Sequence, residues 1–551
     1  MGIPRFFYWL YKEYPNVIKN IQDKETFLKH KIEIDTYALD LNAIVHPVCQ
    51  EVFGYGQYKN GFRQNERLLH QKKYPSKRTE CYNKVCEKIE ELVGVVKPSK
   101  KIIIALDGTA GMSKQYQQRQ RRYRSVIENQ SNSLSEFDPN EITTGSVFMN
   151  ELSQCIQEFI KYKISKDFYW KKLDVYFSSE QVPGEGEHKI MNLLKKFCTF
   201  GSYCIHSPDA DLIMLALSSK CTHDFKNSYI IRENIYKNVY CKYFVVDVNS
   251  FSEIIIENFK TFSIKTHNNI FLSDFITFCL FFGNDFLPEN PLMLTDKNGI
   301  DLLFLFYRET LLNSGNLTCI KNNKISMNID QCLYFFELLS YNENSLYEKK
   351  YKNYNMTLKD FKLNFYKEKL NIVYDDSIQS KKQINKLCQE YLKGIQFVLS
   401  YYLYDIPDWY WYYPYHFSPF FSDICNYLKL LKKNNRQLSF QFEKNIPLTP
   451  FEQLLAVLPP QSSKILPEPF SDLMLSKNSP IYNFYPEITS LQIEIKNEYE
   501  KTILVPFIDV LLLKNTFENT YQDKKELLSN DEINRNYFKE TQSFIKKMNY
   551  K

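Results

Sequence analysis

Short apolar runs alternate with longer helix-like stretches through the first 300 residues of the chain. This alternation predicts an α/β fold with a mostly parallel central sheet flanked by helices, because parallel strands need crossover connections that are usually helical. The polar stretch 130–145 is expected to be a loop. The strands are expected at Thr36–Leu41, Lys101–Leu106, Leu173–Phe177 and Ser202–His206.

The pattern changes after residue 300 and predicts three further parts of the chain. Residues 301–395 become rich in Lys, Asn, Tyr and Glu, typical of a charged, mostly helical connector on the surface. Residues 396–515 are aromatic and rich in proline and predict a second, largely helical region that packs on the first. Residues 516–551 are expected to form a helix or a frayed C-terminal tail.

Composition narrows the class of protein without fixing its function. Hydrophobic residues make up 44% of the chain and charged residues 24%, which is typical of a globular protein. No apolar run approaches the roughly 20 residues of a membrane span. The 13 cysteines are scattered and include no CxxC pair, so we expect a reduced, intracellular protein without a zinc knuckle. The abundance of Tyr, Phe, Lys, Asn and Ile indicates an AT-rich genome, such as that of a virus or a protist.

Acidic residues follow or adjoin the apolar runs of the first half. The carboxyl ends of parallel strands share one edge of a sheet, so these acids are expected to converge there. Converging carboxylates repel one another, and hard divalent cations such as Mg²⁺ or Mn²⁺ relieve that repulsion with oxygen ligands. The alternative is that each acid is an ordinary helix cap or loop residue. The candidates are Asp40, Asp107, Glu185, Glu187, Asp209, Asp211 and Asp285.

A net charge of +6 is too small to identify a partner, but the cations are unevenly distributed. Met112–Arg124 contains five cations and no acid. Separate clusters of cations and carboxylates suit an enzyme that acts on a polyanion with metal ions, because phosphates bind at the first and metals at the second. Two metal ions about 4 Å apart can activate water and stabilise a leaving oxygen in phosphodiester cleavage.

The motifs resemble those of the XRN 5′→3′ exoribonucleases. Matching stretches include LDLNAIVHP, ALDG, QQRQRRYRS, VPGEGEHKIM, DADLIML and GNDFLP in the first region, after the opening MGIPRFFYWLYKEYP. WYWYYPYHFSP, PLTPFEQLLAVLPPQSSKILP, SPIYNFYP and PFID follow in the second. The resemblance implies a nuclease core of the flap-endonuclease or PIN-like kind within residues 1–300, two divalent ions and processive release of 5′-nucleotides. It assigns the metal site to the same seven acids.

The chain departs from the family pattern at a few positions. Gly108-Thr109-Ala110-Gly111 stands where the family usually has Ala-Pro-Arg after Asp-Gly, Ser207-Pro208 stands where Gly-Leu is common, and Glu289 where His is common. None of these departures removes an expected metal ligand. The long C-terminal extension of the cytoplasmic enzymes has no counterpart in this sequence.

The resemblance also indicates how the RNA end is bound. Lys114, Gln118, Arg121 and Arg122 have the spacing of one helix face and match the family positions that grip a 5′-monophosphate. A solvated basic face, or nonspecific contact with RNA, is the alternative.

Three further residues are candidates for stacking on bases. His46 is one, with a core histidine as the alternative, and either Trp409 or Trp411 is expected to stack on the terminal base while the other lies in the core.

These expectations define one leading function and two alternatives. The leading function is a metal-dependent, processive 5′→3′ exoribonuclease that degrades single-stranded RNA with a 5′-monophosphate during RNA decay. The alternatives are a flap-endonuclease-like DNA nuclease and an inactive RNA-binding scaffold. We expect a monomer that binds no membrane and acts in the cytoplasm, that of the host if the source is a virus, with the nucleus as the other possible location.

Overall fold

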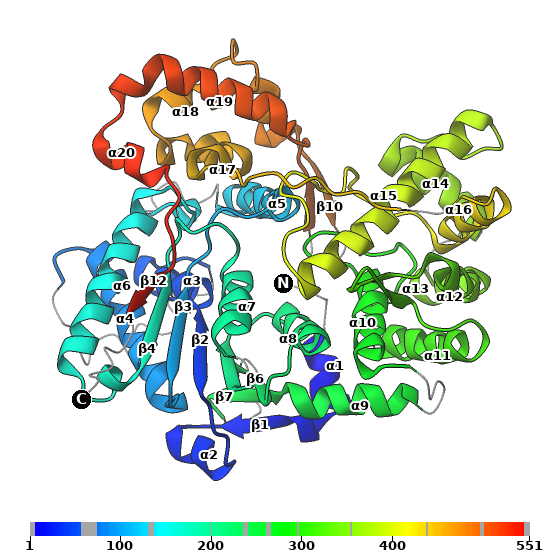
Figure 1. Cartoon of the computed structure of the whole chain (residues 1–551). Helices are drawn as coiled ribbons and strands as arrows, with labels where there is room; N and C mark the ends of the chain where they lie inside the picture. The colour runs from blue at the N-terminus through cyan, green and yellow to red at the C-terminus, as the bar shows by residue number, and fades with distance from the viewer. Residues whose placement is uncertain are drawn as a thin grey trace. The chain divides into compact units, whose positions relative to one another are not determined.

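The strands expected from the apolar runs pair side by side in one sheet (Figure 1). The central strands are β5 (Ser202–His206), β2 (Thr36–Asp40), β3 (Lys101–Ala105) and β4 (Asp174–Ser178), and adjacent strands in this set are parallel. The predicted α/β class, the mostly parallel sheet and these strands are therefore confirmed. The computed structural model describes residues 6–56, 74–129, 137–198, 200–234, 241–260, 266–294, 297–352, 355–436, 439–495 and 501–544, so the MGIPR start and residues 130–136 of the loop expected at 130–145 lie outside it. The described part of that loop includes a short 3-10 helix, Pro139–Glu141.

Further strands extend the sheet on both sides. Within the described residues it has eight strands in the order β1-β7-β6-β5-β2-β3-β4-β12. β6 (Asn227–Glu233) is parallel to β5, and β12 (Gln542–Phe544) is antiparallel to β4. The remaining two are β1 (Ile18–Ile21) and β7 (Tyr243–Asp247).

The described part of the C-terminal stretch, up to Phe544, forms helices and adds a strand to this sheet. It contains α19 (Val510–Lys524) and α20 (Asn530–Arg535) before β12. The Gln181 side chain donates to the carbonyls of Asn534 and Tyr537, and the backbone N–H of Lys539 donates to the Gln181 carbonyl. These bonds bring the chain to the free edge of β4, where the backbone of β12 completes the ladder.

Alternate residues of the central strands face two helical layers. Tyr37, Leu39, Ile102 and Ile104 lie in a buried core with residues of α3 (Asn42–Phe53), α4 (Lys77–Val96) and α6 (Val147–Lys166). On the other face Tyr176 of β4 stacks on Phe197 of α7 (Gly186–Phe197), with ring centroids 4.6 Å apart. These strands are apolar on both faces, so both faces of the sheet need covering helices.

The chain forms two compact units, each built from separated segments and each described by itself. The sheet unit comprises Asn20–Pro208, Phe225–Val245 and Asn445–Lys551. The helical unit comprises Met1–Lys19, Asp209–Asp224 and Val246–Lys444. The division at residues 300, 395 and 515 expected from the sequence stays a prediction. Among the described residues no helix combines the length and the apolar character needed to cross a bilayer.

The sheet unit carries further helices around its core. They include α2 (Lys24–Lys29), α5 (Met112–Asn129), α17 (Pro450–Val457) and α18 (Glu468–Leu475). A short hairpin, β10 (Gln492–Ile495) with β11 (Lys501–Leu504), belongs to the same unit. The helix α5 contacts both α17 and β11, so the basic helix lies against the C-terminal part of the chain.

The helical unit includes the stretch expected to be a surface connector. That stretch is mostly helical, as predicted, but it is not confined to the surface, since Phe335, Phe336, Tyr366 and Leu387 are buried in the unit's core. Its apolar residues recur at helical spacing between charged residues, and the average composition of the stretch does not show this pattern. The unit contains α1 (Phe6–Glu13), α8 (Asp211–Thr222), α9 (Val248–Lys260), α10 (Asn268–Cys279), α11 (Lys297–Asn313), β8 (Thr318–Lys321), β9 (Lys324–Met327), α12 (Ile329–Tyr341), α13 (Glu343–Lys350), α14 (Leu358–Leu370), α15 (Ile378–Leu403) and α16 (Phe421–Lys433).

Candidate active site

Two acids lie together where adjacent parallel strands end. Asp40 is the last residue of β2, and Asp107 follows the end of β3. A Cβ placed on Gly186 would lie 2.9 Å from Asp40 Oδ1 and 3.2 Å from Asp107 Oδ1, so both carboxylates lie beside the same point. Asn42, the first residue of α3, donates from Nδ2 to Asp107 Oδ2 at 2.7 Å. The sequence predicted this pair, because the two strands are neighbours and parallel.

The PGEGEHK loop reaches these carboxylates through Gly186, which stands between two more acids. The backbone N–H of Gly186 donates to Asp107 Oδ1 at 2.7 Å. Glu185 occupies the N-cap position of α7 without a side-chain capping bond, and Glu187 lies in the first turn, where the helix dipole favours negative charge. Both glutamates are buried, with 4% and 9% of their surface exposed.

Glycine is required where this loop meets the segment after Asp107. The N–H of Gly108 donates to the Gly184 carbonyl at 2.9 Å, and the N–H of Gly184 donates to the Thr109 carbonyl at 2.7 Å. A Cβ on Gly108 would lie 1.8 Å from the Val182 carbonyl oxygen, and Gly184 has a φ of +103°. The close backbone approach therefore explains why Gly follows the Asp of ALDG and precedes the Glu of PGEGE.

Two lysines balance part of this negative charge. Lys114 Nζ lies 2.5 Å from Glu185 Oε2, and both side chains are largely buried. Lys189 donates to the carbonyls of Ser179 and Val182. Burial lowers the pKa of Lys189 to about 7, against the opposing effect of the Asp107 and Glu180 carboxylates.

The donor set of this unit fits a hard divalent cation. Asp40, Asp107, Glu185 and Glu187 offer carboxylate oxygens, the ligands that Mg²⁺ and Mn²⁺ prefer. As the side chains stand, no group of three or more His, Cys, Asp or Glu among the described residues has the arrangement of a metal site. Asn42 donates to Asp107 and Lys114 pairs with Glu185, so both carboxylates have protein partners in this structure.

The other three predicted acids belong to the helical unit. Asp209 precedes α8, and Asp211 is the first residue of that helix and is 5% exposed. Asp285 lies in the turn after α10, where Asn284 Oδ1 accepts from the backbone N–H groups of Phe286 and Leu287. The joint site of all seven acids stays a prediction.

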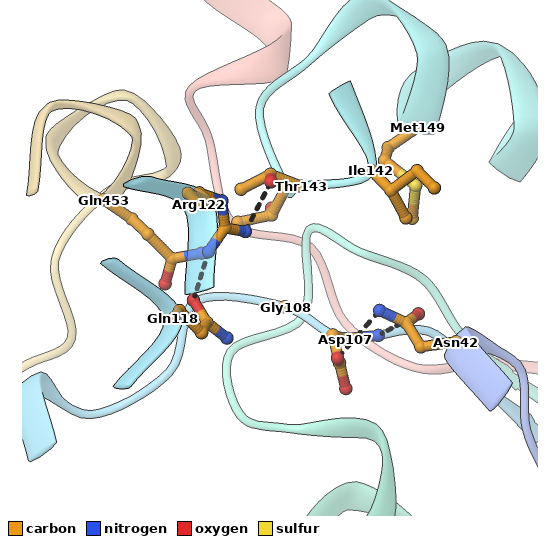
Figure 2. A pocket seen from close by; sticks show the side chains of 10 residues that line it. Asn42, Asp107, Gly108, Gln118, Arg122, Ile142, Thr143, Met149 and Gln453 are labelled. Atoms are coloured by element: carbon orange, nitrogen blue, oxygen red, sulfur yellow. Dashed lines mark hydrogen bonds between the residues drawn. The ribbon is translucent and has the colours of Figure 1, made fainter. Parts of the chain in front are cut away.

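A pocket lies between the predicted phosphate-binding helix and Asp107 (Figure 2). Arg122 donates from Nη2 to Thr143 Oγ1 at 2.5 Å and from Nη1 to Gln118 Oε1 at 3.5 Å. Burial and the neighbouring Arg121 lower the pKa of Arg122 to about 9, which leaves it cationic at neutral pH. The pocket is lined by Asn42, Asp107, Gly108, Gln118, Arg122, Ile142, Thr143, Thr144, Met149 and Gln453.

The four residues predicted to hold a phosphate have different surroundings. Gln118 and Arg122 line the pocket, Lys114 pairs with Glu185, and Arg121 is exposed. Sequence reasoning missed Asn42, Thr143 and Gln453 as pocket residues. Asn42 stands within LDLNAIVHP and could have been found there, whereas Thr143 and Gln453 carry no signal of their own.

The stacking candidates are distributed over both units. His46 is half-buried on α3 in the sheet unit. Trp411 packs against Phe397 in the helical unit, with ring centroids 4.5 Å apart, and is 9% exposed. Trp409 is half-buried in the same unit. Trp411 is thus the less exposed of the two, and the assignment of one of them to the terminal base stays a prediction.

Comparison with known proteins agrees with this geometry. Residues 1–234 match the family described as the XRN 5′-3′ exonuclease N-terminus. Residues 265–364 and 355–551 match the Xrn1 helical domain. Both matches fall on the regions where the sequence motifs were found.

Curated relatives align with almost the whole chain. The chain is 26% identical to 5′-3′ exoribonuclease 1 of Schizosaccharomyces pombe, over 98% of this chain and 50% of that protein. It is 27% identical to human 5′-3′ exoribonuclease 1, over 96% of this chain and 34% of the human protein. It is 24% identical to 5′-3′ exoribonuclease 2 of Candida albicans, over 100% of this chain and 75% of that protein.

The chain therefore spans about half of the fission yeast protein and about a third of the human one. Family matches over most of its length, in the order expected from the motifs, show that the chain belongs to the XRN 5′-3′ exonuclease family.

Proposed function

We propose that this chain is a metal-dependent, processive 5′→3′ exoribonuclease that degrades single-stranded RNA with a 5′-monophosphate to nucleoside 5′-monophosphates. The observation that carries the proposal is that one pocket is lined by Gln118 and Arg122 of the basic helix and by Asp107 of the acid cluster. A cation that holds a terminal phosphate beside a carboxylate that holds a metal is the arrangement that cleavage next to an RNA end requires.

Each group in the pocket has a distinct role in this proposal. Arg122 is half-buried, and its enclosed Nε has no hydrogen-bond partner within the described ranges, so a phosphate oxygen would satisfy it. Gln118 and Arg122 would orient the 5′-phosphate, with Lys114 and Arg121 adding charge. His46 and one of Trp409 and Trp411 would stack on the terminal base without reading its identity.

The acids would hold the metal ions. We assign Asp40, Asp107, Glu185, Glu187, Asp209, Asp211 and Asp285 as oxygen ligands of two Mg²⁺ or Mn²⁺ ions. Bound there, the ions would activate a water and stabilise the charge that develops on the leaving oxygen. Asn42 and the Gly186 N–H, both bonded to Asp107, would fix the orientation of that carboxylate. By resemblance to the family we propose a monomer that acts in the cytoplasm.

Matched RNA substrates test this function. Cleavage of 5′-phosphorylated RNA in Mg²⁺ should release mononucleotides from the labelled 5′ end and stop in EDTA. RNA with a 5′-hydroxyl should be a poor substrate and circular RNA should survive. Preference for 5′-flap DNA would favour the flap-endonuclease alternative, and RNA binding without cleavage would favour the scaffold.

Variants of the basic helix test the phosphate pocket. A hydrogen bond to a charged group is worth about 1.5–3 kcal/mol net, so Arg122→Met or Arg121→Met should cost roughly ten- to a hundredfold on 5′-phosphorylated RNA. Arg124→Met is the matched control, because Arg124 pairs with Glu128 on the same helix. Losses equal on 5′-phosphate and 5′-hydroxyl RNA would overturn the pocket assignment.

A further inference from the structure

The ion pair between Lys114 and Glu185 joins two groups that the proposed function assigns to different ligands. Lys114 lies on α5 and is a candidate for the 5′-phosphate, whereas Glu185 immediately precedes α7 and is a candidate metal ligand. Their charged atoms lie 2.5 Å apart, and the side chains are 14% and 6% exposed. Little water reaches the pair, so each charge is compensated mainly by protein groups.

Either ligand alone would disturb this pair. A divalent cation on Glu185 would take its carboxylate oxygens and repel the nearby ammonium of Lys114. A phosphate on Lys114 would take its ammonium and leave Glu185 as a buried carboxylate in need of a cation. The binding of one ligand therefore removes the competitor of the other.

We propose that the Lys114–Glu185 ion pair couples metal binding to 5′-phosphate binding, so that each ligand increases the affinity of the other. This inference rests on the proposed function. By thermodynamic linkage the two affinities change by the same factor, typically fivefold to 150-fold for coupled sites. An enzyme without metal would then bind RNA 5′ ends weakly. RNA would therefore not stay bound to enzyme molecules that cannot cleave it.

Asp107 provides the control position for a test of this coupling. Asp107 lies in the same pocket wall and carries the same charge as Glu185, but its hydrogen bonds within the described part of the chain are to Asn42 and the Gly186 N–H, and not to Lys114. Substituting Asp107 therefore removes one negative charge near the phosphate site without releasing the ammonium. Comparison of the two positions separates competition for Lys114 from simple charge removal.

The test measures binding of a nucleoside 3′,5′-bisphosphate by calorimetry, with no cleavage involved. In EDTA, Glu185→Gln should bind this probe at least fivefold more tightly than Asp107→Asn does, because only the first variant removes the carboxylate that pairs with Lys114. In wild type, adding Mg²⁺ should strengthen probe binding, and this gain should shrink at least fivefold in Lys114→Met. Thermal melting checks that each variant is folded.

The outcomes distinguish the inference from the function beneath it. Equal probe affinities of Glu185→Gln and Asp107→Asn in EDTA, or an undiminished Mg²⁺ effect in Lys114→Met, would overturn the coupling while leaving the phosphate site in place. If wild type with Mg²⁺ binds the bisphosphate no better than a nucleoside 3′-monophosphate, the phosphate pocket itself is wrong. Should Glu185→Gln fail to fold, Lys114→Met alone decides.

Discussion

Gly186 is the position where one methyl group tests the geometry of the acid cluster. It is the first residue of α7, and a Cβ there would lie 2.9 Å from Asp40 Oδ1 and 3.2 Å from Asp107 Oδ1. Both atoms are the ends of side chains and not backbone. In Gly186→Ala the fold can therefore accommodate the methyl group, but only by moving the carboxylates.

The size of the effect follows from these contacts. Ordinary contacts of a Cβ begin at 3.4 Å, so the Asp40 oxygen must retreat by about half an ångström, which is the tolerance within which catalytic groups must be held. A displacement of about 1 Å can cost a hundredfold in rate. We expect Gly186→Ala to lose roughly ten- to a hundredfold in kcat on 5′-phosphorylated RNA, and to bind Mn²⁺ more weakly. Stability should change little, since alanine is preferred to glycine in a helix by about 0.5–1 kcal/mol.

Gly94→Ala is the matched control. Gly94 lies within α4, and a Cβ there would meet nothing within 4 Å. This variant should be as active as wild type and slightly more stable. The assay compares single-turnover cleavage, Mn²⁺ affinity and melting temperature for both variants. Full activity of a folded Gly186→Ala would refute the assignment of Asp40 and Asp107 as the acids that act in cleavage.

Three further predictions concern stability and are measured by thermal unfolding. Arg119→Leu should lower the free energy of unfolding by roughly 3 kcal/mol or more, because the buried guanidinium donates to two backbone carbonyls, whereas Arg124→Leu on the same helix should cost little. Asp274→Asn should be strongly destabilising, because the two carboxylate oxygens accept hydrogen bonds from five donors and an amide nitrogen cannot accept. The control is Asp376→Asn at an exposed position, and equal melting temperatures of the two variants would contradict the prediction. Burial lowers the pKa of His416 to about 4, below the value of about 6.5 in an unfolded chain. Between these two values the unfolded chain takes up a proton that the folded chain does not, so the free energy of unfolding should fall as pH drops from about 6.5 towards 4. His416→Gln should make the free energy of unfolding less dependent on pH in this range.

Much of the sheet could be predicted because its strands carry their own signal. The runs at 36–41, 101–106, 173–177 and 202–206 are apolar and bounded by polar residues, as fully buried parallel strands are. The edge strand β12 could not be predicted, since Gln542–Phe544 has neither length nor alternation. Its place depends on hydrogen bonds from Gln181, which stands more than 350 residues earlier.

The candidate site also has parts that the sequence predicts and parts that it does not. Asp40 and Asp107 were predictable because parallel strands bring their carboxyl ends together. The assignment of four neighbouring residues of α5 to one ligand was less complete, because spacing fixes a helix face but not the partner that each side chain finds. Lys114 reaches Glu185, while Gln118 and Arg122 turn to the pocket.

The C-terminal region helps to form the pocket that we propose for the 5′-phosphate. Gln453 Oε1 accepts from the backbone N–H of Ala110 at 2.8 Å and lines the pocket. Arg119 Nη1 donates to the Ala456 carbonyl at 3.0 Å, and Gln120 Nε2 donates to the Ile503 carbonyl at 3.2 Å. Arg119 and Gln120 thus hold α5 against α17 and β11, which belong to the C-terminal part of the same unit. Gln118 and Arg122 stand beside them on the helix, so the orientation of these pocket side chains depends on residues more than 300 positions away. The proposed phosphate pocket therefore requires both family regions.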